Sequence, residues 1–317
     1  MGSAMARDLN GYLNVFKPPG ITSHDVIRRL RRLTGLRRIG HAGTLDPAAV
    51  GVLPVALGRA TRTLASRAWD AKLYLADVRL GAATDTDDAG GAVVATGTFD
   101  AVDEPSIQRG LTQFVGDIRQ RPPAYSAVHT GGGRAYMRAR RGQATDLPAR
   151  MVRVDAVGLV AWARPVLTLL VQCRSGTYVR SIARDFGSAV GCPAHLDGLV
   201  RLRVGPFRVE DALGLETLAL VAELEAWDSV LWPADVAAWE LPAIIAPESR
   251  ALDLGHGRPW RACDALGNPR GQFDARVYDA EGALLGFARR SRDGLWHPLR
   301  GISPSGGDSD DKADPDA

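Results

Sequence analysis

Apolar residues recur with helical spacing in two stretches of the chain. The first predicts a helix over 23–34, which Ser23 can cap and Gly35 can end. Its apolar stripe consists of Val26, Ile27, Leu30 and Leu33. The second predicted helix follows a turn at Ser175-Gly176 and ends at Gly191. Its stripe consists of Val179, Ile182, Ala183, Phe186 and Val190.

Two other stretches have the pattern of β-strands. Residues 71–80 alternate well enough for a strand that ends at Gly81, and 166–173 form a short apolar run. The predicted strands and helices do not follow each other in a regular βαβ order. This mixture is typical of an α+β fold.

A segment of different composition interrupts the chain at about 122–150. It contains three consecutive glycines, 131–133, and then an arginine-rich run over 134–141 that Gly142 ends. We expect a mobile, basic insertion rather than a part of the core.

The composition changes again from about residue 246, where short apolar pieces are separated by turns such as Glu281-Gly282 and Asp293-Gly294. These features predict a small β domain. The predicted organisation is a tag or disordered N-terminus at 1–8, a main domain at 9–245, the β domain at 246–302 and a disordered acidic tail at 303–317.

The formal net charge of +3 is unevenly distributed. The tail from Ser303 carries five aspartates and one lysine, a net charge of −4, so the remainder carries +7. Arginine supplies nearly all the positive charge, because the chain has only three lysines, Lys17, Lys72 and Lys312. Guanidinium groups bind phosphates through a planar fork, which suits an RNA partner. A GC-rich genome or a warm habitat explains the same bias.

The three cysteines, Cys173, Cys192 and Cys263, are widely spaced and lie outside any C-x-x-C pattern. This spacing argues against a zinc site and a disulfide framework, and for a reducing cytoplasm. No apolar run reaches the about 20 residues of a membrane span, and residues 1–5 lack the regions of a signal peptide. We therefore expect a cytoplasmic protein that does not enter a membrane.

The stretch GHAGTLDP, from Gly40 to Pro47, is the most informative about chemistry. Pro47 disfavours a helical conformation at Asp46, so a carboxylate is held on a stiff turn. Asp followed by Pro is also the pattern of a helix N-cap with proline at the first helical position. These residues alone leave open whether Asp46 is a reactive carboxylate or the cap of a helix that begins at Pro47.

Longer motifs closely resemble those of the TruB family of pseudouridine synthases. In chain order they are Lys17-Pro18-Pro19-Gly20-Ile21-Thr22-Ser23, the Gly40–Pro47 stretch, Gly51-Val52-Leu53-Pro54, Lys72-Leu73-Tyr74, Leu80-Gly81 with Thr84-Asp85-Thr86-Asp87, Tyr125-Ser126-Ala127, Gly176-Thr177-Tyr178-Val179-Arg180 and Leu199-Val200-Arg201. The resemblance extends over about 13–207. It departs from the family at His129 and Val200, where lysine and arginine are frequent, and at Met137, where glutamate is common.

This resemblance implies a pseudouridine synthase fold. It consists of a mixed, mainly antiparallel central sheet, a thumb-like insertion and a small PUA-like C-terminal β domain that binds RNA. The implied enzyme is an isomerase that converts uridine 55 in the T arm of tRNA to pseudouridine. The reaction detaches uracil from C1′ of ribose and rejoins it through C5, so no cofactor, metal or guide RNA is expected.

Two alternatives to this interpretation stay open. One is a guide-RNA-dependent synthase that works with partner proteins, and the other is a non-catalytic RNA-binding module. The insertion and the compact C-terminal segment favour the stand-alone form. We expect a cytoplasmic monomer that binds tRNA without an obligatory protein partner.

By the resemblance, Asp46 is the nucleophile and Arg180 is its partner. A neighbouring guanidinium lowers a carboxylate pKa by roughly 1–3 units, which keeps the carboxylate ionised. Arg180 is also predicted to lie near the start of a helix, where the dipole disfavours a cation. On local sequence alone, a pair with Asp185 or a contact with phosphate is favoured over a pair with Asp46.

The resemblance also gives roles to three residues that line the pocket. Tyr74 would stack on the uridine once it is flipped out of the RNA, and could help to remove the C5 proton. Tyr178 and Leu199 would line the same pocket. Ordinary core packing explains all three as well.

The remaining candidates concern RNA binding. His41 resembles the family's histidine that contacts displaced nucleotides, and Lys17 would support the site or contact phosphate. The arginines expected along the RNA backbone are Arg28, Arg29, Arg31, Arg32, Arg37 and Arg38, with Arg134, Arg138, Arg140 and Arg141 in the insertion. A solvated helix face is the alternative for each of them.

Overall fold

The computed structural model describes residues 9–64, 69–124, 129–130, 133–134, 147–261 and 273–301. Most of the predicted insertion, including Arg138, Arg140 and Arg141, and the predicted tail lie outside these residues.

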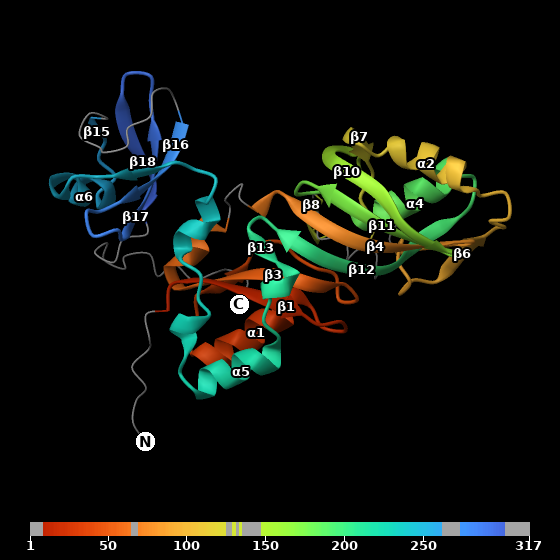
Figure 1. The fold of residues 1–317 in the computed structure, drawn as a ribbon, viewed down its shortest axis with the longest axis horizontal. Coiled ribbons are helices and arrows are strands. Elements are labelled where there is room, and N and C mark those ends of the chain that lie inside the picture. Colours follow the sequence, from red (N-terminus) through yellow and green to blue (C-terminus); the bar gives the residue numbers. More distant parts are fainter. Residues whose placement is uncertain are drawn as a thin grey trace.

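A nine-stranded sheet forms the centre of the molecule (Figure 1). Its spatial order is β1-β3-β12-β4-β11-β10-β7, with β2 beside β3 and β13 beside β12. The strands are β1 Gly11–Lys17, β2 Ile39–His41, β3 Val50–Leu57, β4 Lys72–Leu80, β7 Gly116–Gln120, β10 Arg150–Ala163, β11 Val166–Cys173, β12 Ala194–Val204 and β13 Phe207–Arg208. Among these described strands only β3 and β12 pair in parallel, so the predicted mixed, mainly antiparallel sheet is confirmed.

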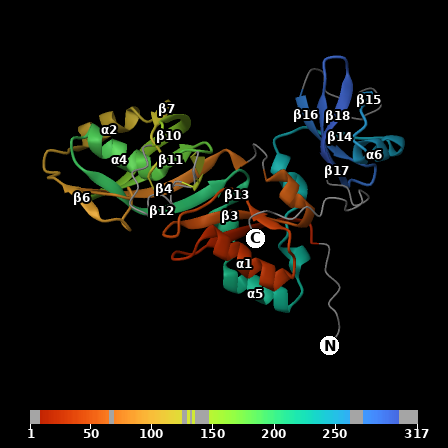
Figure 2. The ribbon, with the colours of Figure 1, turned by 180° about the vertical axis from the view of Figure 1, so that it is seen from behind.

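Two pairs of helices cover the two ends of this sheet. Helices α1 (Ser23–Thr34) and α5 (Leu215–Glu223) pack on β1 and β3, whereas α2 (Glu104–Thr112) and α4 (Val179–Ala189) pack on β4, β10 and β11. The view from behind shows the same two groups well separated along the long axis (Figure 2). Short 3₁₀ helices lie at η1 Gly58–Thr63, η3 Val209–Asp211, η4 Trp227–Ser229 and η5 Ala234–Ala238. Two small hairpins pair β5 Ala82–Thr84 with β6 Val93–Thr96, and β8 His129–Thr130 with β9 Gly133–Arg134.

The predicted helix over 23–34 is confirmed, but Thr22 and not Ser23 caps it. Thr22 Oγ1 accepts a hydrogen bond from the Asp25 amide at 3.0 Å, and the Asp25 carboxylate accepts one from the Thr22 amide at 2.9 Å. This reciprocal pair satisfies two N–H groups of the first turn. Gly35 ends the helix in the left-handed conformation, with φ 72°, as predicted.

The other predicted elements also lie close to their predicted positions. The strand expected over 71–80 is β4, and the apolar run over 166–173 is β11. The turn at Ser175-Gly176 is present, and α4 follows it. Every second residue of β4 is buried, which is the period of a strand with one face in the core.

A separate five-stranded sheet forms the C-terminal part, in the order β14-β16-β17-β18-β15. Its strands are β14 Ala243–Ile245, β15 Trp260–Arg261, β16 Phe273–Tyr278, β17 Leu284–Arg290 and β18 Leu295–Gly301, with helix α6 Glu248–Gly255 beside them. The sheet thus begins with β14, three residues before the boundary predicted at 246. Phe287 belongs to the same buried apolar cluster as Ala237 and Ala238, and Tyr278 donates a hydrogen bond to Asp235. These contacts join this sheet to the main part of the chain.

One glycine is required where β3 passes β12. Gly51 has a φ of +107°, and a Cβ on it would lie 2.3 Å from the carbonyl oxygen of Arg201. Backbone atoms cannot move aside as a flexible side chain can, so this position admits only glycine.

We therefore expect Gly51→Ala to lower the free energy of unfolding by about 2–4 kcal/mol, from left-handed strain and the steric clash together. Chemical denaturation measures this. Gly158→Ala is the matched control, because Gly158 lies in β10 and no atom lies within 4 Å of the place that its new methyl group would take. The control should change the free energy of unfolding by less than about 1 kcal/mol. Equal effects of the two substitutions would contradict the steric argument.

Candidate functional site

Asp46 lies in the loop between β2 and β3. No helix begins at Pro47: the Ala49 amide donates to the Asp46 carbonyl at 3.1 Å in a turn, and β3 starts at Val50. The alternative in which Asp46 caps a helix is therefore wrong. Its side chain is 41% exposed, so the carboxylate is accessible from solvent.

Buried polar groups hold this loop from below. Ser23 Oγ accepts a hydrogen bond from the Leu45 amide at 2.9 Å and donates to the Leu45 carbonyl at 3.2 Å. Lys17 is fully buried, and its Nζ donates to the carbonyls of Pro18 at 2.9 Å and Pro47 at 3.1 Å. Burial lowers the pKa of Lys17 to about 8, against the opposing charge of Asp46. Of the two roles expected for Lys17, this geometry fits support of the loop, because a fully buried ammonium does not reach a phosphate.

Arg201 holds the other side of the loop. Its guanidinium donates to the carbonyls of Gly43 at 3.0 Å, Thr44 at 3.4 Å and Val52 at 2.7 Å, and the residue is fully buried. The loop that carries Asp46 is thus fixed at both ends by buried cations that bind backbone oxygens.

Arg180 reaches Asp46 from the first turn of α4. Its Nε lies 3.0 Å from Oδ2 of Asp46, and its Nη2 donates to Oδ1 at 3.3 Å. The Nη1 atom lies 3.4 Å from the Asp88 carboxylate and donates to the Thr86 carbonyl at 3.1 Å. The alternative pair of Arg180 with Asp185 is wrong, because Arg184 forms that pair at 2.9 Å.

The electrostatic balance at Asp46 differs from the prediction. Burial raises the pKa of Asp46 above its ordinary value, and the charge of Asp88 raises it further. Arg180 and Lys17 lower it, with the sign expected, but they do not outweigh the crowding of atoms around the carboxylate. The expectation of a net lowered pKa is therefore wrong, and Arg180 acts by limiting the rise.

Tyr74 lies in β4 and is 7% exposed. Burial raises its pKa, while the positive charge of Arg201, its cross-strand neighbour in β12, opposes the rise. The charge of Asp46 also raises the pKa of Tyr74, and Leu45 and Ala49 from the Asp46 loop belong to the same buried apolar cluster as Tyr74. Asp46, Arg180 and Tyr74 therefore converge, although 134 positions separate Asp46 from Arg180 in the chain.

Tyr178 is half-buried at the N-cap position of α4. The Gln120 side chain binds its backbone at two points, accepting from the Tyr178 amide at 2.8 Å and donating to its carbonyl at 3.0 Å. The guanidinium of Arg150 lies 5.1 Å from the centre of the Tyr178 ring. Leu199 is half-buried and packs against the core beneath α4. The structure thus leaves both side chains partly accessible.

His41 ends β2 and is half-buried. Burial, with the charge of Arg201, lowers its pKa to about 4, so the imidazole is neutral near pH 7. Its Nδ1 atom is buried and has no hydrogen-bond partner among the described residues.

The candidate RNA-binding arginines fall into three groups. Arg29, Arg31, Arg32 and Arg37 are exposed and Arg38 is half-buried. Arg28 is exposed but forms an ion pair with Asp25 on its own helix. Arg134 belongs to β9, with no description of its side chain, and the remaining insertion arginines lie outside the described residues.

In the described part of the chain, no group of three or more His, Cys, Asp or Glu side chains is placed to hold a metal ion. Cys173 and Cys192 are buried free thiols, and Cys263 lies outside the description. No helix in the described ranges is long and apolar enough to span a membrane.

Two family models match most of the chain: the N-terminal domain of TruB family pseudouridylate synthase over residues 31–179, and the C-terminal domain of tRNA pseudouridylate synthase B over 180–252. The tRNA pseudouridine synthase B of Roseobacter denitrificans is 40% identical over 298 residues, 94% of this chain and 97% of that protein. The chain belongs to the TruB family.

A second bacterial relative and a solved structure are also similar to this chain over most of its length. The tRNA pseudouridine synthase B of Heliobacterium modesticaldum is 42% identical, over 79% of this chain and 81% of that protein. Among solved structures, a chain of a Cbf5-Nop10-Gar1 complex aligns with a TM-score of 0.71 and 26% identity, over 93% of this chain and 85% of that chain. The TruB assignment and the predicted pseudouridine synthase fold are both confirmed.

Sequence reasoning missed four groups in this TruB-family site. Arg201 and Lys72 were inside quoted motifs but had no role, and Asp88 is the residue after one of those motifs. Gln120 lies just before the predicted insertion. A charged residue within a predicted strand, as at Lys72, was the available signal, because such a residue needs a specific partner if it is buried.

The contact between Ser23 and Leu45 can be tested. Ser23→Ala leaves the buried Leu45 amide without its acceptor, so we expect a loss of about 1–3 kcal/mol in the free energy of unfolding. Faster hydrogen exchange at Leu45 should accompany it. The control is Ser229→Ala, which removes an exposed hydroxyl bond to the Ala226 carbonyl and should cost less than about 0.5 kcal/mol. Unchanged exchange at Leu45 would show that Ser23 does not hold the loop.

Proposed function

We propose that this chain converts uridine 55 in the T arm of tRNA to pseudouridine, with Asp46 as the nucleophile. The arrangement of Asp46 carries the proposal. Its carboxylate is open to solvent on one side and bound at two points by the buried guanidinium of Arg180 on the other. An ion pair that only stabilises the fold does not require a solvent-accessible carboxylate on a loop that several buried side chains hold in place.

The residues around Asp46 suit this reaction. The reaction needs an ionised carboxylate beside ribose and base, and a surface that holds the detached uracil. Arg180 and Lys17 limit the rise in the pKa of Asp46, which favours the ionised form that the reaction needs. Tyr74 offers an aromatic ring for the base, and Tyr178 and Leu199 border the same region. A uridine in a folded RNA arm must leave its stack to reach them.

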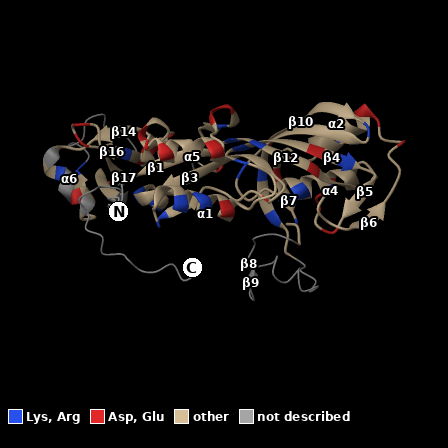
Figure 3. Cartoon of the chain, turned by 90° about the horizontal axis from the view of Figure 1, so that it is seen from below, with Lys and Arg blue, Asp and Glu red and all other residues tan. Residues whose placement is uncertain are grey.

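Positive charge close to the site suits an RNA backbone. The exposed arginines of α1 lie along the lower edge of Figure 3, the same edge as β7. A cavity of about 930 Å³ is lined by Arg119, Arg121 and Arg184, and Arg184 is one helical turn from Arg180. Arginine side chains at such places bind phosphates without reading base sequence.

We also propose that the chain works as a monomer in the cytoplasm, without guide RNA or protein partners. The relatives that are 36–42% identical are bacterial enzymes with the name tRNA pseudouridine synthase B, which favours this form over the guide-dependent alternative. Purified protein alone should release tritium from tRNA transcript labelled at C5 of uridine. Release only after addition of partner proteins would refute this part of the proposal.

We expect Asp46→Asn to abolish pseudouridine formation, because the amide is not a nucleophile. The affinity for tRNA should stay within about an order of magnitude, since the contacts with phosphates remain. Single-turnover conversion and filter binding measure the two quantities. Asp100→Asn is the charge-matched control on an exposed turn, and it should remain active. Full activity of Asp46→Asn would refute the assignment of the nucleophile.

The pH dependence of the rate follows from the pKa of Asp46. The ionised carboxylate is lost as the pH falls through its raised pKa. The decline of kcat/KM on the acid side should therefore begin at a higher pH than it would for an aspartate with an ordinary pKa. Asp88→Asn removes a neighbouring negative charge that raises this pKa. The acid limb should therefore move to lower pH in Asp88→Asn and stay in place in Asp100→Asn. A shift to higher pH would contradict this electrostatic account.

A further inference from the structure

Two arginines one helical turn apart on α4 bind two successive aspartates of the loop that joins β5 to β6. Nη1 of Arg180 lies 3.4 Å from the carboxylate of Asp88. Nη1 of Arg184 lies 2.6 Å from Oδ2 of Asp87. A short contact between charged groups is the stronger one. The stronger of these two contacts therefore belongs to Arg184, and the weaker one belongs to the arginine that binds Asp46.

The loop holds the Asp88 carboxylate in one orientation. Oδ1 of Asp88 accepts hydrogen bonds from Thr86 Oγ1 at 2.7 Å and from the Gly90 amide at 3.0 Å, and Oδ2 faces Arg180. The Thr86 carbonyl of the same loop accepts a hydrogen bond from Arg180 Nη1 at 3.1 Å. The direction of the Arg180 guanidinium therefore depends on where this loop lies against α4.

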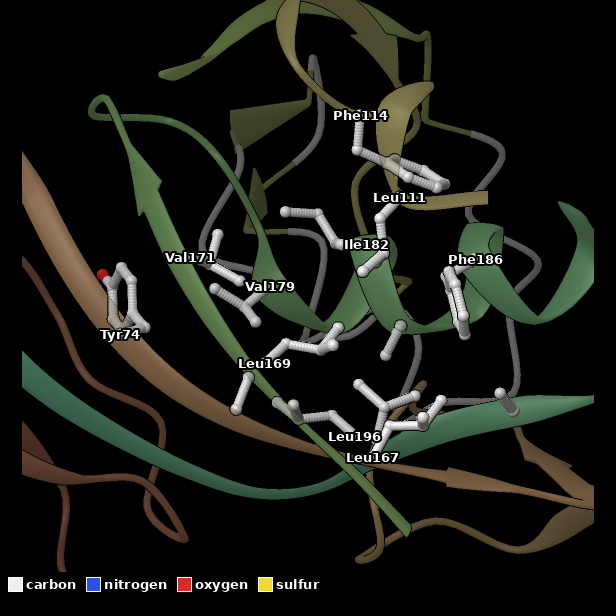
Figure 4. Packing of buried hydrophobic residues seen from close by; sticks show 14 of the residues in the cluster. Tyr74, Leu111, Phe114, Leu167, Leu169, Val171, Val179, Ile182, Phe186 and Leu196 are labelled. Atoms are coloured by element: carbon white, nitrogen blue, oxygen red, sulfur yellow. The ribbon is translucent and has the colours of Figure 1, made fainter. Parts of the chain in front are cut away.

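Strand β12 anchors the loop and the helix separately. The backbone of Leu196 accepts from the Ala89 amide at 2.9 Å and donates to the Asp87 carbonyl at 3.0 Å. The side chain of Leu196 lies in the same apolar cluster as Ile182 and Phe186 of α4 (Figure 4). Apolar packing is non-directional, so it constrains the rotation of the helix less tightly than a charge-assisted hydrogen bond does. An ion pair between the loop and α4 supplies that constraint.

Asp87 is a costly residue at its position. It is 9% exposed, and its backbone has a φ of 61°, in the left-handed region. Burial raises the pKa of Asp87, and the charge and hydrogen bond of Arg184 oppose the rise. Arg184 is itself held from a second side, because its Nη2 donates to the Arg121 carbonyl at 3.0 Å. A buried carboxylate on a strained backbone is typical of a residue whose contact has a function.

We propose that Asp87 and Arg184 form a positioning pair that sets the orientation of the Arg180 guanidinium toward Asp46. The inference rests on the proposed function. The pair fixes the loop against α4, so that Nη1 of Arg180 faces Asp88 while Nε and Nη2 face Asp46. Without the pair, the Arg180 guanidinium turns away, and Asp46 loses contacts that favour its ionised form.

The pH dependence of the rate separates positioning from a simple charge effect. Burial raises the pKa of Asp46 most, Asp88 raises it further, and Arg180 and Lys17 lower it. Removal of the negative charge of Asp87 would by charge alone lower the pKa of Asp46, because a nearby like charge raises it. Loss of the alignment of Arg180 would instead raise the pKa of Asp46. The two explanations therefore predict opposite shifts of the acid limb of the rate.

Asp87→Asn is the main test. Asparagine has nearly the same size and tolerates the left-handed backbone, so the substitution removes the charge without adding strain. Asp85→Asn is the matched control, because Asp85 is exposed in the same loop and accepts from the Ala92 amide on the side chain that is changed. Single-turnover conversion of tRNA at saturating protein is measured over a range of pH, and the affinity for tRNA is measured by filter binding.

We expect Asp87→Asn to slow conversion near neutral pH by about 10-fold or more, with the acid limb moved to higher pH. The affinity for tRNA should stay within about twofold, since no phosphate contact is removed. Asp85→Asn should behave like the wild type. A wild-type rate in Asp87→Asn, or an acid limb moved to lower pH, would overturn the proposal. So would a loss of affinity as large as the loss of rate, because Asp87 would then act through RNA binding.

A double variant tests whether the two residues act as a pair. Arg184 also lines the cavity of about 930 Å³, whose described lining does not include Asp87, so Arg184→Gln should weaken tRNA binding as well as slow conversion. At saturating protein, Asp87→Asn combined with Arg184→Gln should be no slower than Arg184→Gln alone, because both substitutions break one contact. Losses that multiply would show that the two residues act independently and would overturn the pair.

Arg184→Lys carries the test if Asp87→Asn does not fold. It keeps the positive charge, but one ammonium nitrogen cannot take the places of the three guanidinium nitrogens that bind Asp87, Asp185 and the Arg121 carbonyl. Conversion by Arg184→Lys should therefore slow, with the acid limb again moved to higher pH. An unchanged rate and pH profile would contradict the positioning role.

A further measurement does not depend on activity. The ¹³Cγ resonance of Asp46, assigned by its loss in Asp46→Asn, gives the pKa of this carboxyl in the protein without RNA. The pKa should be higher in Asp87→Asn than in the wild type and unchanged in Asp85→Asn. An unchanged or lower pKa in Asp87→Asn would overturn the positioning role. Wild-type conversion is measured first, so that failure of the proposed function itself is recognised separately.

Discussion

The site depends on the ion pair between Asp46 and Arg180, which joins a loop near the start of the chain to a helix far along it. The pair does more than fix a distance. Burial and Asp88 raise the pKa of the carboxylate, and Arg180 and Lys17 lower it. The outcome is a carboxylate that is more basic than an ordinary aspartate, beside two cations that favour its ionised form. Basicity of this kind favours attack by an oxygen nucleophile.

Buried cations organise the rest of the site. Two of the three lysines, Lys17 and Lys72, and the arginines Arg180 and Arg201 all have little or no exposure. Lys17, Lys72 and Arg201 each donate to backbone carbonyls, so loops are held by charges that lack a carboxylate partner in the described chain. Such an arrangement costs stability. Buried cations are retained where a positive potential has a function, and here they lie around the phenol of Tyr74 and the carboxylate of Asp46.

The topology of the sheet explains why these groups meet. Strand β12 is late in the chain, yet it inserts between β3 and β4. This insertion places Arg201 beside Tyr74 on one side and Gly51 on the other. Gly51 lets the two backbones approach closely, and the loop before β3 then lies above the guanidinium. The same sheet carries β11, from which the chain turns into α4 and presents Arg180.

The sequence by itself determined the local elements and the family. Periodicity gave the helix at 23–34, the strands β4 and β11 and the helix after Ser175-Gly176, because the burial of one face has a fixed period in each kind of element. It did not determine the cap at Thr22, since Ser23 has equal capping chemistry and only its contact with Leu45 removes it from that role.

Only the tertiary structure decided the electrostatics of the site. The sign of the pKa shift at Asp46 was predicted from one partner, whereas burial by distant segments outweighed that partner. Asp88, Gln120 and Arg201 received no role from their local sequence, because a polar residue in a strand or loop gives no sign of the atoms it will face. Those atoms come from strands that are neighbours in the sheet and remote in the chain. Charge interactions depend on the distance between groups and on their burial, and both are set only once the chain has folded.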